Sequence, residues 1–204
     1  MNNLQIIKEL GIKQTGIIKK LHKTYTEPGS LNYLLYGRQP SLQSLNIKFG
    51  RVGEIIAKKM IELSPHLELL QCGCHVINDN GKKKDLDLLW ANHNEKKIFY
   101  RELKGNIELD TEKLPAMISK INDVIVDYIK SKYNDYIIDI GILNWSVYDR
   151  TIFKKSKCLT HIKKCEKKNI KVDHMNDFMQ LINFQWDKED FYSYFKELGI
   201  ILNH

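Results

Sequence analysis

Two acidic residues and one lysine lie close together in an otherwise apolar part of this 204-residue chain. Asp87 belongs to an apolar-rich stretch at residues 85–91, and Glu102 and Lys104 belong to a second such stretch at residues 97–104. The residues between the two stretches are polar, which is typical of the turn of a β-hairpin. We therefore expect an antiparallel hairpin that carries all three side chains.

The geometry of such a hairpin would bring the three side chains together. With the turn centred near residues 93–95, Asp87 and Glu102 lie at symmetric positions and face each other across the two strands. Side chains alternate between the faces of a strand, so Glu102 and Lys104 share one face while Leu103 points to the core. The two carboxylates are therefore expected to converge beside an ammonium group.

Two carboxylates beside one lysine are suited to the metal-assisted hydrolysis of a phosphodiester. Hard carboxylate oxygens hold Mg²⁺, which lies near the attacking water and the scissile phosphate. The lysine stabilises the hydroxide and the negative charge that develops on the phosphorus centre. Two acids in an apolar hairpin repel each other, so the pattern makes most sense if a divalent ion such as Mg²⁺ or a lysine compensates them.

The sequence around these residues resembles a known signature. The chain is similar to the PD-(D/E)XK nuclease superfamily in two runs, Lys84-Asp85-Leu86-Asp87-Leu88-Leu89-Trp90 and Phe99-Tyr100-Arg101-Glu102-Leu103-Lys104. The resemblance extends roughly over residues 44–145, and residues 105–113 are similar to the segment after the motif in some type II restriction endonucleases.

The resemblance implies a role for each residue of the motif. Asp87 and Glu102 would ligate Mg²⁺, Lys104 would be the catalytic lysine, and Glu54 from the preceding helix would be an auxiliary acid. The proline of the signature is absent from this sequence, and Asp85 and Asp87 are expected to share one face of the strand, so Asp85 remains an alternative to Asp87 as the first metal ligand. We favour Asp87 because an apolar pair comes after it and because it pairs better across the turn.

The resemblance also implies a fold and an activity. We expect an α/β, restriction-endonuclease-like fold with a central mixed sheet of about five strands flanked by helices. The implied activity is that of a type II restriction enzyme, a sequence-specific endonuclease that cuts double-stranded DNA with Mg²⁺ and leaves a 5′-phosphate. A homodimer is expected because cutting both strands of a symmetric site calls for a symmetric protein. Two alternatives remain open: another nuclease of the superfamily, such as a junction resolvase or repair nuclease, or a non-catalytic DNA-binding module.

Composition and charge agree with a folded protein that binds a polyanion. Hydrophobic residues make up 43% of the chain, and 32 Lys and Arg against 25 Asp and Glu give a net charge of +7. This excess favours phosphate contacts, although a lysine-rich surface also serves solubility. Our candidates for DNA contacts are Lys48, Arg51, Lys82, Lys83 and Lys84. A basic stretch at residues 150–171 could also grip a DNA backbone, and a solvated helix face is an equally weighted explanation of it.

The remaining elements are predicted from hydrophobic periodicity and turn residues. We predict two short helices broken at Gly11, a turn-rich segment at residues 27–40, helices over 44–63, 111–130 and 187–199, and strands over 67–77, 136–145 and 169–172. The length favours a single domain over residues 1–204. It would comprise an N-terminal helical and turn-rich segment (1–40), a catalytic core (44–145) and a basic, helical C-terminal part (150–204).

Cysteine usage and the absence of a long apolar run bear on the compartment. Four cysteines are too few for a disulfide scaffold, and no run approaches the ~20 apolar residues of a membrane span, so we expect a cytoplasmic protein with no membrane contact. A zinc site is the other interpretation of the cysteine and histidine residues, which are Cys72, Cys74, His75, Cys158, His161 and Cys165. Their spacing lacks the usual paired ligands, and burial of the thiols is the simpler explanation.

Overall fold

The computed structural model of the chain describes residues 2–22, 34, 42–76, 83–107, 113–153 and 157–203. Within these residues the chain divides into a helical unit, Met1–Met60 with Gln185–His204, and an α/β unit, Ile61–Phe184. The expectation of a single domain stays a prediction. Most of the turn-rich segment predicted at 27–40 lies outside the described residues.

The helical unit contains α1 (Asn3–His22), α8 (Lys188–Asn203) and all but the last two residues of α3 (Leu42–Glu62). The expected break at Gly11 is wrong, because α1 runs through this glycine without interruption. A Cβ atom at Gly11 would lie 1.8 Å from the Tyr194 hydroxyl, which donates to the Lys8 carbonyl at 3.0 Å. Gly11 therefore permits the close approach of α8 and does not end a helix.

The last helix begins as predicted and ends later. Asp187 accepts hydrogen bonds from the backbone N–H groups of Glu189 and Asp190, which is the arrangement of an N-terminal cap. At the other end α8 continues past Gly199 to Asn203, so the predicted end at Gly199 is wrong. A glycine within a helix costs only about 1 kcal/mol relative to alanine, which packing against α1 outweighs.

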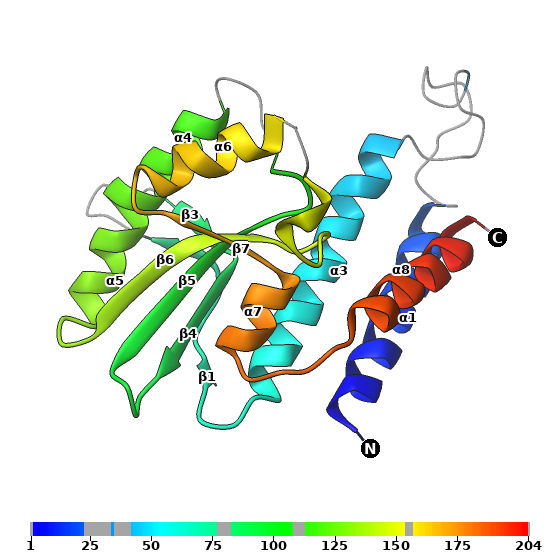
Figure 1. Cartoon of the computed structure of the whole chain (residues 1–204), viewed down its shortest axis with the longest axis horizontal. Helices are drawn as coiled ribbons and strands as arrows, with labels where there is room; N and C mark the ends of the chain where they lie inside the picture. The colour runs from blue at the N-terminus through cyan, green and yellow to red at the C-terminus, as the bar shows by residue number, and fades with distance from the viewer. Residues whose placement is uncertain are drawn as a thin grey trace. The chain divides into compact units, whose positions relative to one another are not determined.

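A five-stranded mixed sheet forms the centre of the α/β unit, with strand order β1-β4-β5-β6-β7 (Figure 1). Its strands are β1 (Glu68–Leu69), β4 (Leu88–Asn92), β5 (Lys97–Lys104), β6 (Ile137–Asn144) and β7 (Lys171–His174). The β1–β4 and β4–β5 pairs are antiparallel, whereas β5–β6 and β6–β7 are parallel. The predicted α/β class with a mixed central sheet of about five strands is confirmed.

Two of the predicted strands are each divided between two sheets. The stretch 67–77 forms β1 and β2 (Gly73–Val76), and the stretch 85–91 is interrupted at Asp87, which separates β3 (Lys83–Leu86) from β4. β2 and β3 pair with each other in a small antiparallel sheet. Sequence pattern alone missed both interruptions, because apolar residues continue across each of them.

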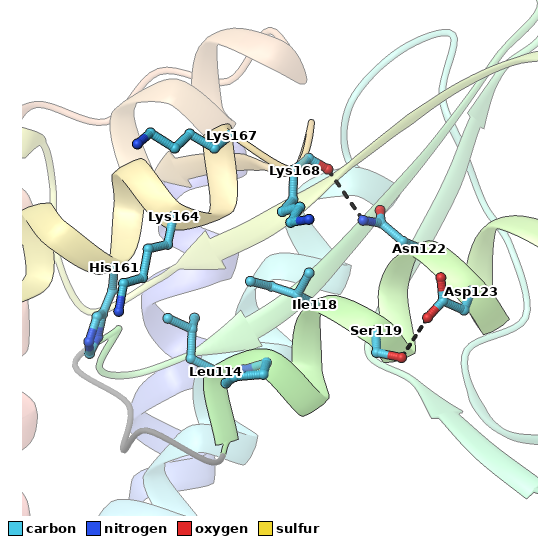
Figure 2. A pocket seen from close by; sticks show the side chains of 10 residues that line it. Leu114, Ile118, Ser119, Asn122, Asp123, His161, Lys164, Lys167 and Lys168 are labelled. Atoms are coloured by element: carbon cyan, nitrogen blue, oxygen red, sulfur yellow. Dashed lines mark hydrogen bonds between the residues drawn. The ribbon is translucent and has the colours of Figure 1, made fainter.

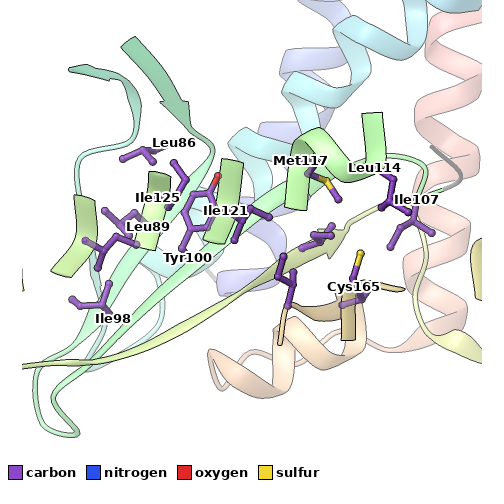
Figure 3. Close-up of a cluster of buried hydrophobic side chains, with 14 of the residues drawn as sticks. Leu86, Leu89, Ile98, Tyr100, Ile107, Leu114, Met117, Ile121, Ile125 and Cys165 are labelled. Carbon is purple, nitrogen blue, oxygen red and sulfur yellow. The ribbon is translucent and has the colours of Figure 1, made fainter. Parts of the chain in front are cut away.

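One face of the central sheet is covered by helices that come after β5 and β6. α4 (Lys113–Ser119), a π-helical turn η1 (Lys120–Ile125) and α5 (Val126–Lys132) form one continuous helical stretch, which agrees with the helix predicted at 111–130. α6 (Lys157–Glu166) lies beside them (Figure 1). Their apolar side chains and those of the sheet form a buried core, and Figure 3 shows Leu89, Ile98, Tyr100, Ile121 and Ile125 within it.

The opposite face carries α7 (Met175–Leu181) and a buried ionic cluster. Trp90 stacks on Phe99 with ring centroids 5.1 Å apart and meets Phe178 of α7 edge-on at 5.9 Å. Arg101, with only 1% of its side chain exposed, pairs with Asp139 at 2.9 Å and with Asp173 at 2.6 Å. A guanidinium buried against two carboxylates ties β5 to β6 and β7.

None of the helices in the described ranges is long and apolar enough to cross a membrane.

Candidate active site

The hairpin predicted to carry the chemistry is present. Leu88 of β4 lies opposite Arg101 of β5, and Asn92 lies opposite Lys97, so the turn falls at residues 93–96. Glu102 and Lys104 are two residues apart on β5, and the ammonium group of Lys104 lies 2.9 Å from Glu102 Oε1. The expectation that these two side chains share a face of the strand is confirmed by this contact.

Asp87 lies at the junction between β3 and β4 and is fastened to β5. Its Oδ2 accepts a hydrogen bond of 2.7 Å from the backbone N–H of Leu103. That N–H points toward β4, and the carboxylate takes the place of the next carbonyl of the strand ladder. The interruption of the strand at Asp87 therefore holds its side chain next to Glu102.

Asp85, the alternative first ligand, has a different environment. It lies on β3 opposite Cys74, in the two-stranded sheet, and its side chain is exposed. The expectation that Asp85 and Asp87 share one face of a single strand is wrong, because the strand ends between them. Of the two aspartates, Asp87 is the one hydrogen-bonded to the strand that carries Glu102.

Glu102 is buried, with 7% of its side chain exposed, and accepts hydrogen bonds from three side chains. Besides Lys104, Lys120 of η1 lies 2.7 Å from Oε2, and the Tyr100 hydroxyl donates to the same oxygen at 2.5 Å. Sequence reasoning missed both of these residues. Tyr100 could have been found, because it precedes Glu102 by two positions and shares its face, whereas no motif spacing points to Lys120.

The electrostatics of the two carboxylates differ. Burial and the neighbouring Glu102 raise the pKa of Asp87 to about 6, against the opposing influence of the Leu103 N–H and the two lysines. Burial acts in the same direction on Glu102, but Lys104 and Lys120 outweigh it and lower the pKa of that carboxyl. The pair thus consists of one carboxylate held in its charged form by lysines and a second that is harder to ionise.

These residues fit a divalent cation. Mg²⁺ is usually held by one or two carboxylates together with waters and substrate phosphates, so Asp87 and Glu102 supply a sufficient protein set. Oδ1 of Asp87 accepts no hydrogen bond from any residue in the described ranges, and a cation between the acids would relieve their repulsion. In the same ranges no group of three or more His, Cys, Asp or Glu residues is arranged to hold a metal.

Three other predicted contributors come from a single helix. Glu54 is on α3 in the helical unit, where it pairs with Lys58, so its role as auxiliary acid stays a prediction. Lys48 and Arg51 line a cavity of about 520 Å³ in that unit, between α1 and α3.

The lysine run before Asp87 is described only in part. Lys83 is exposed and Lys84 is half-buried on β3, whereas Lys82 lies outside the described residues. Contacts of these three lysines with DNA stay predictions.

The cysteines fall into two separate groups and all four are free thiols. Cys158 and Cys165 of α6 are buried in the hydrophobic core, and burial raises the pKa of the Cys165 thiol to about 11. Cys74 lies on β2 and is exposed, and Cys72 comes directly before that strand. Their environments explain the two buried thiols without a metal.

Part of the basic stretch lines a pocket between α6 and the helical stretch of α4 and η1. Figure 2 shows Lys164, Lys167 and Lys168 along a cavity of about 570 Å³, across from Leu114 and Ile118 of α4. The helices are joined there by the Asn122 side chain, which donates to the Lys168 carbonyl at 3.3 Å (Figure 2). The expectation that this stretch grips a DNA backbone stays a prediction.

Comparison of the chain with protein-family models, with curated proteins and with solved structures gave no match.

Proposed function

We propose that this protein is a Mg²⁺-dependent endonuclease of the PD-(D/E)XK type that cuts double-stranded DNA, with a type II restriction enzyme as the specific candidate. The observation that carries the proposal is the convergence of Asp87, Glu102 and Lys104 at one end of the β4–β5 hairpin. The resemblance of the sequence to the superfamily signature supports the same assignment.

Each residue has a role in the proposed reaction. Asp87 and Glu102 would hold Mg²⁺, which supplies Lewis-acid stabilisation of the phosphate and lowers the pKa of bound water. Lys104, whose side chain is 27% exposed and whose ammonium group lies 2.9 Å from Glu102, would orient the attacking water and neutralise charge on the phosphate. Attack by the water oxygen breaks the bond between phosphorus and O3′, the water proton passes to O3′, and the 5′-phosphate is left.

The fold supports this placement of the chemistry. The motif strand β5 is central in the sheet, with antiparallel β4 on one side and parallel β6 on the other. Its end at Lys104 adjoins the end of β6 at Asn144, so the acidic pair lies at the carboxyl edge of two parallel strands. Ligand sites of open α/β sheets occur at such edges. The restriction-endonuclease-like topology, the homodimer and the sequence specificity are parts of the same proposal.

Digestion of a plasmid of known sequence tests the activity. We expect the wild-type protein with Mg²⁺ to give discrete fragments with 5′-phosphate ends, and chelation of the metal to stop cleavage. A smear would point to a nonspecific nuclease of the superfamily, and an intact plasmid would contradict the enzymatic assignment.

Two variants of β5 separate catalysis from folding. Lys104→Ala should lower the cleavage rate by about 100-fold to 1,000-fold, the size of effect seen when one charge-stabilising donor is removed, while DNA binding is retained. Lys97→Ala is the matched control, because Lys97 begins the same strand and pairs with Glu95 near the turn. Equal cleavage by wild type and Lys104→Ala would remove Lys104 from the mechanism.

A further inference from the structure

Lys120 is a second ammonium group on Glu102, and the motif assigns it no role. It comes from a different element, the π-helical turn η1, and reaches Glu102 Oε2 at 2.7 Å. Its side chain is 20% exposed, so the ion pair is largely shielded from solvent. A shielded pair between a lysine and a proposed metal ligand bears directly on how the metal would bind.

The backbone conformation at Lys120 is unusual. A π-helix of six residues, Lys120–Ile125, separates α4 from α5. π-Helical turns are rare and occur often at functional sites, because the extra residue per turn redirects the side chains. The buried Ile121 and Ile125 keep this turn packed on the core, and Lys120 is the first residue of the turn.

Three hydrogen-bond donors already occupy the two oxygens of Glu102. Lys104 lies at Oε1, whereas Lys120 and the Tyr100 hydroxyl share Oε2. A carboxylate oxygen has two lone pairs, so Oε2 is saturated by these two donors. A divalent cation bound to Oε2 would need one of these lone pairs and would repel an ammonium group that stayed there.

Of the three donors, Lys120 is the one placed to leave. Tyr100 and Lys104 flank Glu102 on the same strand, so their backbone positions relative to Glu102 are set by β5 itself. Lys120 reaches the carboxylate from a neighbouring helix through a long, rotatable side chain. If it leaves, the Tyr100 hydroxyl still holds Oε2 in place and one lone pair becomes available for the metal.

We infer that Lys120 is a positioning residue that serves as a built-in counter-cation of Glu102: it holds the carboxylate in the metal-free site and gives up its place at Oε2 when a divalent cation binds. This inference rests on the proposed function. Metal binding then becomes an exchange of one cation for another, and the free protein avoids an uncompensated pair of buried acids.

Titration of the metal-free protein with Mn²⁺ by calorimetry, in the absence of DNA, tests the inference. Lys120→Met keeps the aliphatic stem and removes the charge, so we expect its Mn²⁺ affinity to rise by roughly tenfold or more. Lys120→Arg retains the charge and should leave the affinity near the wild-type value. Lys130→Met is the control, because Lys130 is exposed on α5 in the same helical stretch.

The outcomes separate this inference from the proposed function. Unchanged or weaker Mn²⁺ binding by folded Lys120→Met would overturn the inference alone, because a lysine that only supports the structure lowers metal affinity when it is lost. Absence of Mn²⁺ binding by the wild type would overturn the metal site and the inference with it. Should Lys120→Met fail to fold, Lys120→Gln is measured in its place with the same expected rise.

Discussion

The carboxylate of Asp87 accepts a hydrogen bond from the backbone N–H of Leu103 at 2.7 Å. This bond replaces a rung of the strand ladder, so the chain leaves the sheet at Asp87 while its side chain stays fixed to β5. Leu103 lies between Glu102 and Lys104 in the strand, so the same hydrogen bond holds the Asp87 carboxylate close to these two residues. β5 therefore positions the Asp87 side chain as well as its own Glu102 and Lys104.

Asp87→Asn should separate metal binding from folding. Asparagine retains an oxygen that accepts the Leu103 N–H, so the fold is expected to persist, but it lacks the negative charge that holds a cation. We expect Mn²⁺ affinity to fall by at least about tenfold, because even the loss of a residue that hydrogen-bonds to a metal ligand has an effect of that size. Asp85→Asn is the control and should bind Mn²⁺ like the wild type. Loss of binding in Asp85→Asn alone would instead make Asp85 the ligand.

The ion pair of Asp139 with Arg101 should make the free energy of unfolding depend on pH in the acidic range. Burial raises the pKa of Asp139, but Arg101 and Lys171 outweigh it and lower this pKa below the ordinary value of 3.8. The folded state therefore gains stability that is present above about pH 4 and is lost as the pH falls through the lowered pKa.

Urea unfolding of Asp139→Asn at pH 7 and pH 3 measures this contribution. At pH 7 the variant should be less stable by about 2 kcal/mol, the size of a hydrogen bond to a charged group. The difference from the wild type should shrink at pH 3. A difference that is equal at both pH values would show that the carboxylate charge of Asp139 does not stabilise the fold.

Gly141→Ala should destabilise the α/β unit through the buried Arg101. Gly141 lies opposite Arg101 in the β5–β6 pair, and a Cβ there would lie 2.8 Å from the Lys171 carbonyl and 3.0 Å from Arg101 Nε. The backbone in the centre of a sheet cannot move away from the added Cβ without weakening its hydrogen bonds. We therefore expect the free energy of unfolding, measured in urea, to fall by about 1–3 kcal/mol. Gly105→Ala, whose added Cβ would have its nearest neighbour, Trp145 Nε1, at an ordinary contact distance of 3.6 Å, is expected to be tolerated.

Two glycines of α1 form a matched pair for the helical unit. Gly11→Ala would place a Cβ 1.8 Å from the Tyr194 hydroxyl, whereas Gly16→Ala meets no atom within 4 Å. In thermal unfolding we expect Gly11→Ala to lower the melting temperature and Gly16→Ala to raise it slightly. Alanine has the higher helix propensity, which adds up to about 1 kcal/mol to the free energy of unfolding. Stabilisation by both substitutions would mean that α8 does not approach α1 at Gly11.

The sequence by itself determined the hairpin and the composition of its acidic face. Alternation along a strand is a local property, so it placed Glu102 beside Lys104, and the polar turn set Asp87 opposite Glu102 without knowledge of the rest of the chain. Hydrophobic patterning likewise predicted the helical stretch at 111–130, which is observed at 113–132, and the strand at 136–145, which is observed as β6.

Only the tertiary structure decided which residues from distant segments complete the site. Lys120 contacts Glu102 because the helical stretch that carries it packs on the sheet. The strand divides at Asp87 because β3 pairs with β2 in a second sheet. The continuity of α1 through Gly11 has the same origin, since Tyr194 fills the space of the missing side chain. Contacts of this kind depend on how helices and strands from distant parts of the chain pack together, so local sequence spacing cannot predict them.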